Sequence, residues 1–174
     1  MMALMAMLIA PHLEHNVNLH RALLLILVHD ICETKVGDIP FFEVSERKTT
    51  KAQAEAHAMR EISDMFSDQT GQKMSDLWHE FEDGKTPEAR FARALDHLEV
   101  QHQHNLAAID TWELIEYDLV YTKTSSRCAH DNTLMQIARA IEDQAQQKMI
   151  DAGIDVEAVR KRLAGRPATR RTAC

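Results

Sequence analysis

LLLILVHDICETKVGDIP, residues 23–40, passes from an apolar run into a group of polar side chains. The apolar run leads to His29 and Asp30, and Glu33 and Asp38 follow in the same stretch. A segment that is apolar on nearly every face is typical of a central, buried helix, which we expect over 18–34. An unpaired carboxylate at the end of such a helix is strongly disfavoured, so Asp30 needs a cation, a hydrogen-bond donor or a shifted pKa.

The rest of the chain carries a nearly continuous helical pattern, without a convincing strand. Aromatic residues make up 5% of the sequence, and a composition poor in aromatic residues favours helices packed on helices over a sheet. The fold class is therefore predicted to be all-α, a bundle of about six to eight helices. Besides 18–34, helices are predicted over 1–10, 45–66, 73–82, 86–108, 112–121, 131–151 and 155–164, with Ser45 and Thr86 as caps.

A chain of 174 residues suffices for one domain and is too short to suggest two. We expect a single helical domain over 1–165, followed by a disordered basic tail over 166–174. The basic residues from Arg160 onward, Arg162 among them, are expected to be solvated.

Charge and cysteine content exclude several classes of function. A net charge of −7 argues against a nucleic-acid-binding surface. The apolar start MMALMAMLIA is shorter than the ~20 residues that span a bilayer, and it lacks a basic region and a cleavage site. Cys32, Cys128 and Cys174 form no CxxC pair, which argues against a disulfide framework or a structural zinc site. We expect a cytoplasmic protein without a nucleic-acid or membrane partner.

Asp96 repeats the problem that Asp30 poses, because it lies between Leu95 and Leu98 on the helix predicted over 86–108. If helix packing brings Asp96 to His29 and Asp30, these groups make a mixed nitrogen and oxygen site. Such a site suits Mg²⁺ or a divalent transition metal. The alternative is that each group is satisfied locally, by a backbone donor or by an arginine such as Arg93.

The longer pattern is more specific than any of these residues alone. The string H-D-x-x-E-x-x-x-G-D-I over 29–39, followed by E-x-R-x-x-R-A-L-D-x-L-E over 88–99, resembles the HD-domain metal-dependent phosphohydrolases. Within them it is most similar to the YfbR-like 5′-deoxynucleotidase group. The resemblance covers roughly residues 1–122 and includes the stretches LW-x-E-F-E at 77–82 and TPEAR at 86–90.

The resemblance implies roles for five residues. His29 and Asp30 match the paired metal ligands, and Asp96 matches the distant aspartate that completes the set. Glu33 and Asp38 match acidic residues around the attacking water and the phosphate ester. The implied reaction is hydrolysis of a nucleoside or deoxynucleoside 5′-monophosphate to nucleoside and phosphate. The implied cofactor is one divalent metal ion (Mn, Co, Mg, Zn, Ni or Fe), and the implied assembly is a homodimer.

Helical geometry agrees with these implied roles. On a helix over 18–34, Glu33 lies one turn beyond Asp30 and can assist proton transfer. Gly37 allows the tight bend that turns Asp38 back towards the site.

The family pattern contains one more ligand, a histidine in a Glu-His pair, which would fall several positions before Met1. His12, His15 and His20 are expected to be surface or helix-end residues and not its substitutes. We hypothesise that the natural protein carries roughly 30–40 further N-terminal residues. With three of four ligands, the chain as given is expected to bind metal weakly and to have low activity.

Two other functions stay open. A two-metal HD oxygenase or phosphodiesterase would need extra histidines, for which His57 and His79 are available. A non-catalytic helical module would act by binding or dimerising through the Met-rich apolar start. His97, His102 and His104 are expected to form a solvated helix side.

Overall fold

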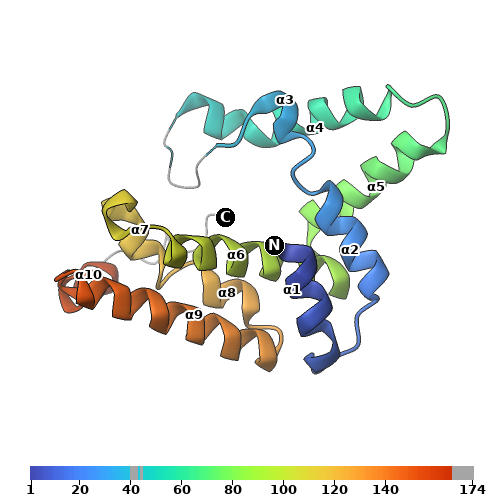
Figure 1. The fold of residues 1–174 in the computed structure, drawn as a ribbon. Helices are drawn as coiled ribbons and strands as arrows, with labels where there is room; N and C mark the ends of the chain where they lie inside the picture. The colour runs from blue at the N-terminus through green and yellow to red at the C-terminus, as the bar shows by residue number, and fades with distance from the viewer. Residues whose placement is uncertain (40–42, 44, 166–174) are drawn as a thin grey trace. The chain divides into compact units, whose positions relative to one another are not determined.

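The computed structural model describes residues 1–39, 43 and 45–165, and over these residues the chain is helical without a strand (Figure 1). This confirms the predicted all-α class. The basic tail over 166–174 lies outside the described residues. The elements are α1 (Met2–Ile9), η1 (Ala10–His12), α2 (Leu19–Val28), α3 (Glu33–Val36), α4 (Glu46–Ser63), α5 (Gln69–Asp83), α6 (Pro87–Leu106), η2 (Ile109–Thr111), α7 (Leu114–Leu119), α8 (Thr124–Cys128), α9 (Asn132–Asp151) and α10 (Val156–Ala164).

The elements form two compact units. One unit contains Val17–Arg93, and the other contains Met1–Asn16 with Ala94–Cys174. Helices α2 to α5 and the start of α6 belong to the first unit, whereas α1, the rest of α6 and α7 to α10 belong to the second. Within the described residues, no helix combines the length and the apolar character that crossing a membrane requires.

The predicted helix over 18–34 is wrong at its end, because α2 stops at Val28 and a separate short helix, α3, begins at Glu33. Residues 29–34, HDICET, are mostly weak helix formers. The ring nitrogen Nδ1 of His29 lies 2.7 Å from the carbonyl oxygen of Ile26. The following backbone bonds are of the tighter i→i−3 type, from Ile31 to Val28 (3.1 Å) and from Glu33 to Asp30 (2.9 Å). His29 and Asp30 therefore lie in a turn after the buried helix.

Helix α5 starts at Gln69 instead of residue 73, because Asp68 caps it by accepting a hydrogen bond from the Thr70 N–H at 2.8 Å. One turn inside this helix start, Gly71 is buried against the end of α4. A Cβ atom at position 71 would lie 2.1 Å from the carbonyl oxygen of Ser63. Glycine is thus what allows the two helices to approach this closely.

In the other unit, a core is formed by residues of α9 and α10 and by the residues that directly follow η2 and α7: Trp112, Val120, Ala145, Met149, Val156 and Val159. Asp118 is buried beside this core, and both its carboxylate oxygens accept hydrogen bonds from the guanidinium of Arg162. Arg162 is exposed, as expected, with 46% of its side chain accessible, but the ion pair with Asp118 was not predicted. Arg160 also makes contacts, with Gln146 at 2.6 Å and with the ring of Tyr121.

Helix α8 was not predicted from the sequence, although Thr124 and Cys128 are buried at its two ends. The three early histidines His12, His15 and His20 are exposed, as expected. The solvated helix side expected for His97, His102 and His104 is wrong, because all three are half-buried. The ring of His104 packs against that of Trp112, and its Nε2 lies 3.4 Å from Glu116.

Candidate metal site at the end of helix α2

His29 is held firmly at the C-cap of α2. Its ring packs against that of Phe81 in α5, with the centroids 5.1 Å apart, and its side chain is 13% exposed. The Ile26 carbonyl oxygen, 2.7 Å from Nδ1, can only accept a hydrogen bond. Nδ1 must therefore carry the hydrogen, which fixes the orientation of the ring and leaves Nε2 as its second polar atom. A backbone carbonyl plays this same part for many metal-binding histidines.

The Nε2 atom of His29 lies 2.9 Å from Oδ2 of Asp30. When the imidazole is neutral with its hydrogen on Nδ1, Nε2 and the carboxylate oxygen are both acceptors. A proton or a metal cation must therefore lie between them. Two ligands about 2.1 Å from a metal ion and at right angles to each other lie about 3.0 Å apart. The pair therefore fits one corner of a coordination shell. The argument from burial is wrong for Asp30, whose side chain is 61% exposed; the neighbouring imidazole nitrogen is what calls for a proton or a cation between the two atoms.

Glu33 is the first residue of α3 and is half-buried. Its Oε1 lies 3.4 Å from the ammonium of Lys51 in α4. Burial raises the pKa of the Glu33 carboxyl, the negative charges of Asp30 and Asp38 raise it further, and Lys51 opposes them. Because both aspartates act on Glu33, the three carboxylates of this segment influence one another. Glu33 and Asp30 are linked through the turn, however, and not along one helix face as predicted.

Asp38 is exposed and follows Gly37, whose φ of 76° lies in the left-handed region. Nothing crowds a Cβ atom at position 37, so the backbone conformation and not space calls for glycine here. The predicted end of the helix at Gly37 is confirmed, whereas the tight bend that would turn Asp38 back towards the site stays a prediction.

Asp96 lies on α6 in the other unit, half-buried beside the fully buried Leu95 and Leu98. Across the residues that the structure describes, no three side chains of His, Cys, Asp or Glu are grouped so that they could hold a metal ion. The structure thus places His29 and Asp30 in contact as a pair. That Asp96 binds the same metal ion stays a prediction.

The local alternative took Arg93 as a partner for the carboxylates. The Arg93 guanidinium instead donates to the carbonyl oxygens of Phe81 and Glu82, so it caps the end of α5. The two histidines considered for a second metal are exposed. His57 lies 3.3 Å from Glu61, and His79 packs edge-on against Trp78.

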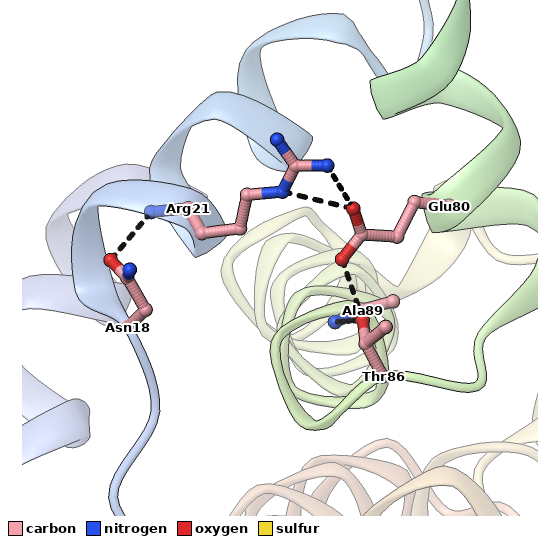
Figure 2. Close-up of polar contacts among 5 residues, drawn as sticks. All are labelled: Asn18, Arg21, Glu80, Thr86 and Ala89. Atoms are coloured by element: carbon pink, nitrogen blue, oxygen red, sulfur yellow. Dashed lines mark hydrogen bonds and ion pairs between the residues drawn. The ribbon is translucent and has the colours of Figure 1, made fainter.

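A polar network that sequence reasoning did not find ties the start of α2 to α5 and α6. Figure 2 shows Glu80 lying between Arg21 and Thr86. The Arg21 guanidinium donates to Glu80 through Nε at 2.9 Å and through a terminal nitrogen, and the Thr86 hydroxyl donates to the other oxygen at 2.7 Å. Thr86 in turn caps α6 by accepting a hydrogen bond from the Ala89 N–H at 3.1 Å, as predicted. The LW-x-E-F-E and TPEAR stretches marked these positions, but nothing in the sequence paired them.

Comparisons with known proteins show the family of the chain. The sequence model of the HD domain family matches residues 1–138. The chain is 40% identical to the 5′-deoxynucleotidase HDDC2 of Danio rerio over 86 residues, which is 49% of this chain and 42% of that protein. It is 35% identical to the HDDC2 protein of Homo sapiens over 100 residues, 57% of this chain and 47% of that protein. The chain thus spans about half the length of the curated relatives that it matches.

A solved structure is also similar. It is that of a predicted metal-dependent phosphohydrolase from Magnetospirillum magnetotacticum MS-1. The TM-score is 0.70 at 26% sequence identity, and the match covers 84% of this chain and 74% of the other.

Proposed function

Since this chain belongs to the HD domain family, we propose that it is a metal-dependent phosphohydrolase. Its substrates are nucleoside or deoxynucleoside 5′-monophosphates, and its products are the nucleoside and inorganic phosphate. The observation that carries this proposal is the meeting of His29 Nε2 and the Asp30 carboxylate at 2.9 Å, with Nδ1 occupied by a backbone carbonyl. The curated relatives named as 5′-deoxynucleotidases support the substrate class.

We propose that His29, Asp30 and Asp96 hold one divalent cation. Nitrogen and carboxylate donors accept Mn, Co, Mg, Zn, Ni or Fe, so the identity of the metal depends largely on availability. The chemistry that a divalent ion supplies in such a site is polarisation of a phosphoryl oxygen and a lowered pKa for water.

Glu33 is the proposed proton carrier, and Asp38 assists it at the attacking water. Burial and the neighbouring carboxylates raise the pKa of Glu33, and a carboxylate with a raised pKa is a better general base near neutral pH. Glu33 takes the proton from the attacking water and delivers it to the 5′-oxygen of the leaving nucleoside. Asp38 accepts the second hydrogen bond of the water and so orients it.

The test is phosphate release by the full-length protein from a panel of 5′-mononucleotides with Mn²⁺, Co²⁺ or Mg²⁺. We expect His29→Ala and Asp96→Ala to lower kcat/KM by more than about 100-fold. The matched controls are His20→Ala on the exposed face of α2 and Asp83→Ala in an exposed ion pair with Lys85, both near wild-type activity. Wild-type activity in His29→Ala would refute the proposal. Inactivity of the wild type with every metal and substrate would favour the binding module, and two metal ions per chain would favour the two-metal enzyme.

We also propose that the protein forms a homodimer and is cytoplasmic. Met1, Leu4, Met7 and Leu8 leave an apolar surface on α1 exposed, which supports the dimer. Among the described residues Cys32 and Cys128 are buried, and the scarcity of cysteines in the sequence supports a reducing compartment. Light scattering of the purified protein checks the dimer.

A further inference from the structure

We propose that Lys51 is a positioning residue for the reaction: its ammonium group, anchored on Glu55, fixes the carboxylate of Glu33 in its working orientation. The inference rests on the proposed function, because the role of Glu33 as proton carrier belongs to that proposal. Lys51 itself touches neither the metal ligands nor the reacting atoms in this account, and it acts through Glu33.

The geometry places one ammonium between two carboxylates. The Nζ atom of Lys51 lies 3.4 Å from Oε1 of Glu33 and 3.3 Å from Oε1 of Glu55. Lys51 and Glu55 are one turn apart on α4, so they share a helix face, whereas Glu33 belongs to α3. All three side chains are half-buried. The long helix α4 thus carries the two residues that hold the single acidic group of α3.

Glu33 needs such a hold for two reasons. Helix α3 has four residues, and a helix of one turn has little stability of its own. The carboxylates of Asp30 and Asp38 also repel Glu33 when it is ionised. Lys51 supplies the opposing charge. Burial lowers the pKa of its ammonium, but Glu55 and Glu33 outweigh this and leave the pKa above its usual value, so Lys51 stays charged.

The chain offers a matched control in a second lysine–glutamate pair between the same two helices. Lys35 of α3 lies 2.7 Å from Oε2 of Glu61 in α4. Lys35 is two residues from Glu33, and its pair with Glu61 also joins α3 to α4, although these two side chains are more exposed, at 32% and 46%. The Lys35–Glu61 pair does not include Glu33. A purely structural role for Lys51 therefore predicts that both lysine variants lose activity.

The experiment compares steady-state kinetics of Lys51→Met and Lys35→Met. We expect Lys51→Met to lower kcat by about 10- to 100-fold with KM changed less than about twofold, because a small misplacement of a general base costs that much. Lys35→Met should stay within about twofold of the wild type. Lys51→Arg should restore most of the lost kcat. In a Glu33→Gln background, Lys51→Met should cause no further loss, because both changes disable the same group.

Equal losses in Lys51→Met and Lys35→Met, or full additivity with Glu33→Gln, would overturn the inference. Crystal structures of the wild type and Lys51→Met give a readout that needs no activity. We expect the Glu33 carboxylate to leave its position in the variant while the α3 backbone stays in place; an unmoved carboxylate refutes the inference. If the wild type hydrolyses no 5′-mononucleotide, the proposed function fails, and the crystal comparison still decides whether Lys51 fixes Glu33.

Discussion

Glu80 is predicted to stabilise the unit formed by Val17–Arg93 through the network of Figure 2. Its side chain is 16% exposed, and it accepts hydrogen bonds from Arg21 and Thr86. Glu80→Gln keeps the size of the side chain but removes the charge. A hydrogen bond to a charged group contributes about 1.5–3 kcal/mol. Because the Arg21 side chain is 41% exposed and glutamine keeps part of the bonding, we expect a loss of about 1–2 kcal/mol at pH 7.

The lowered pKa of Glu80 determines how its contribution to stability changes with pH. Burial acts to raise the pKa of Glu80, but the hydrogen bonds from Arg21 and Thr86 outweigh it and hold the pKa below its ordinary value of 4.5. The contribution of Glu80 to stability is therefore fully present above that ordinary value. It is lost as the pH falls through the lowered pKa of the folded state.

Urea denaturation of the wild type and Glu80→Gln, repeated from pH 7 down to about pH 3, measures both effects. The difference in free energy of unfolding should shrink as the pH falls below 4.5. The control is Glu157→Gln, whose side chain is 75% exposed and 3.7 Å from Arg160; we expect no measurable change there. The reasoning fails if Glu80→Gln behaves like this control at pH 7, or if its deficit is unchanged at low pH.

Two further stability predictions follow from buried contacts. Gly71→Ala should cost about 2–3 kcal/mol in urea denaturation, because its Cβ would lie 2.1 Å from the carbonyl oxygen of Ser63, whereas Gly165→Ala, with its nearest atom at 3.7 Å, should be tolerated. Wild-type stability in Gly71→Ala would contradict the close packing of α4 and α5. Arg162→Met should cost about 2–3 kcal/mol by leaving the buried Asp118 without this guanidinium. Adding Asp118→Asn should recover part of that loss, and strict additivity of the two changes would refute the pairing.

Local signals predicted most of the helices. Ser45 and Thr86 cap α4 and α6 as expected, because a side-chain oxygen next to an apolar periodic segment acts over a few residues. The break between α2 and α3 was not predicted, since it depends on the His29 ring bonding to the Ile26 carbonyl. The close approach at Gly71 was missed for a similar reason, because the neighbour that requires glycine is Ser63 of another helix.

The candidate site was predicted in part. The adjacency of His29 and Asp30 and the end of a helix at Gly37 could be predicted from the sequence, and both are present. The exposure of Asp30 could not be predicted from the sequence, because it depends on where α2 ends. The Lys51–Glu33 and Arg21–Glu80 pairs were not predicted. The partners are 18 and 59 residues apart, respectively, and no local sequence pattern joins them. The histidine ligand expected before Met1 stays a prediction, and so does the role of Asp96 as a metal ligand.

The central claim is that His29, Asp30 and Asp96 share one metal ion. Anomalous diffraction from a crystal of the protein grown with Mn²⁺ tests it most directly. The account predicts one peak within about 2.0–2.3 Å of His29 Nε2 and of both aspartate carboxylates. A peak that Asp96 does not reach, or manganese bound elsewhere on the chain, would contradict it.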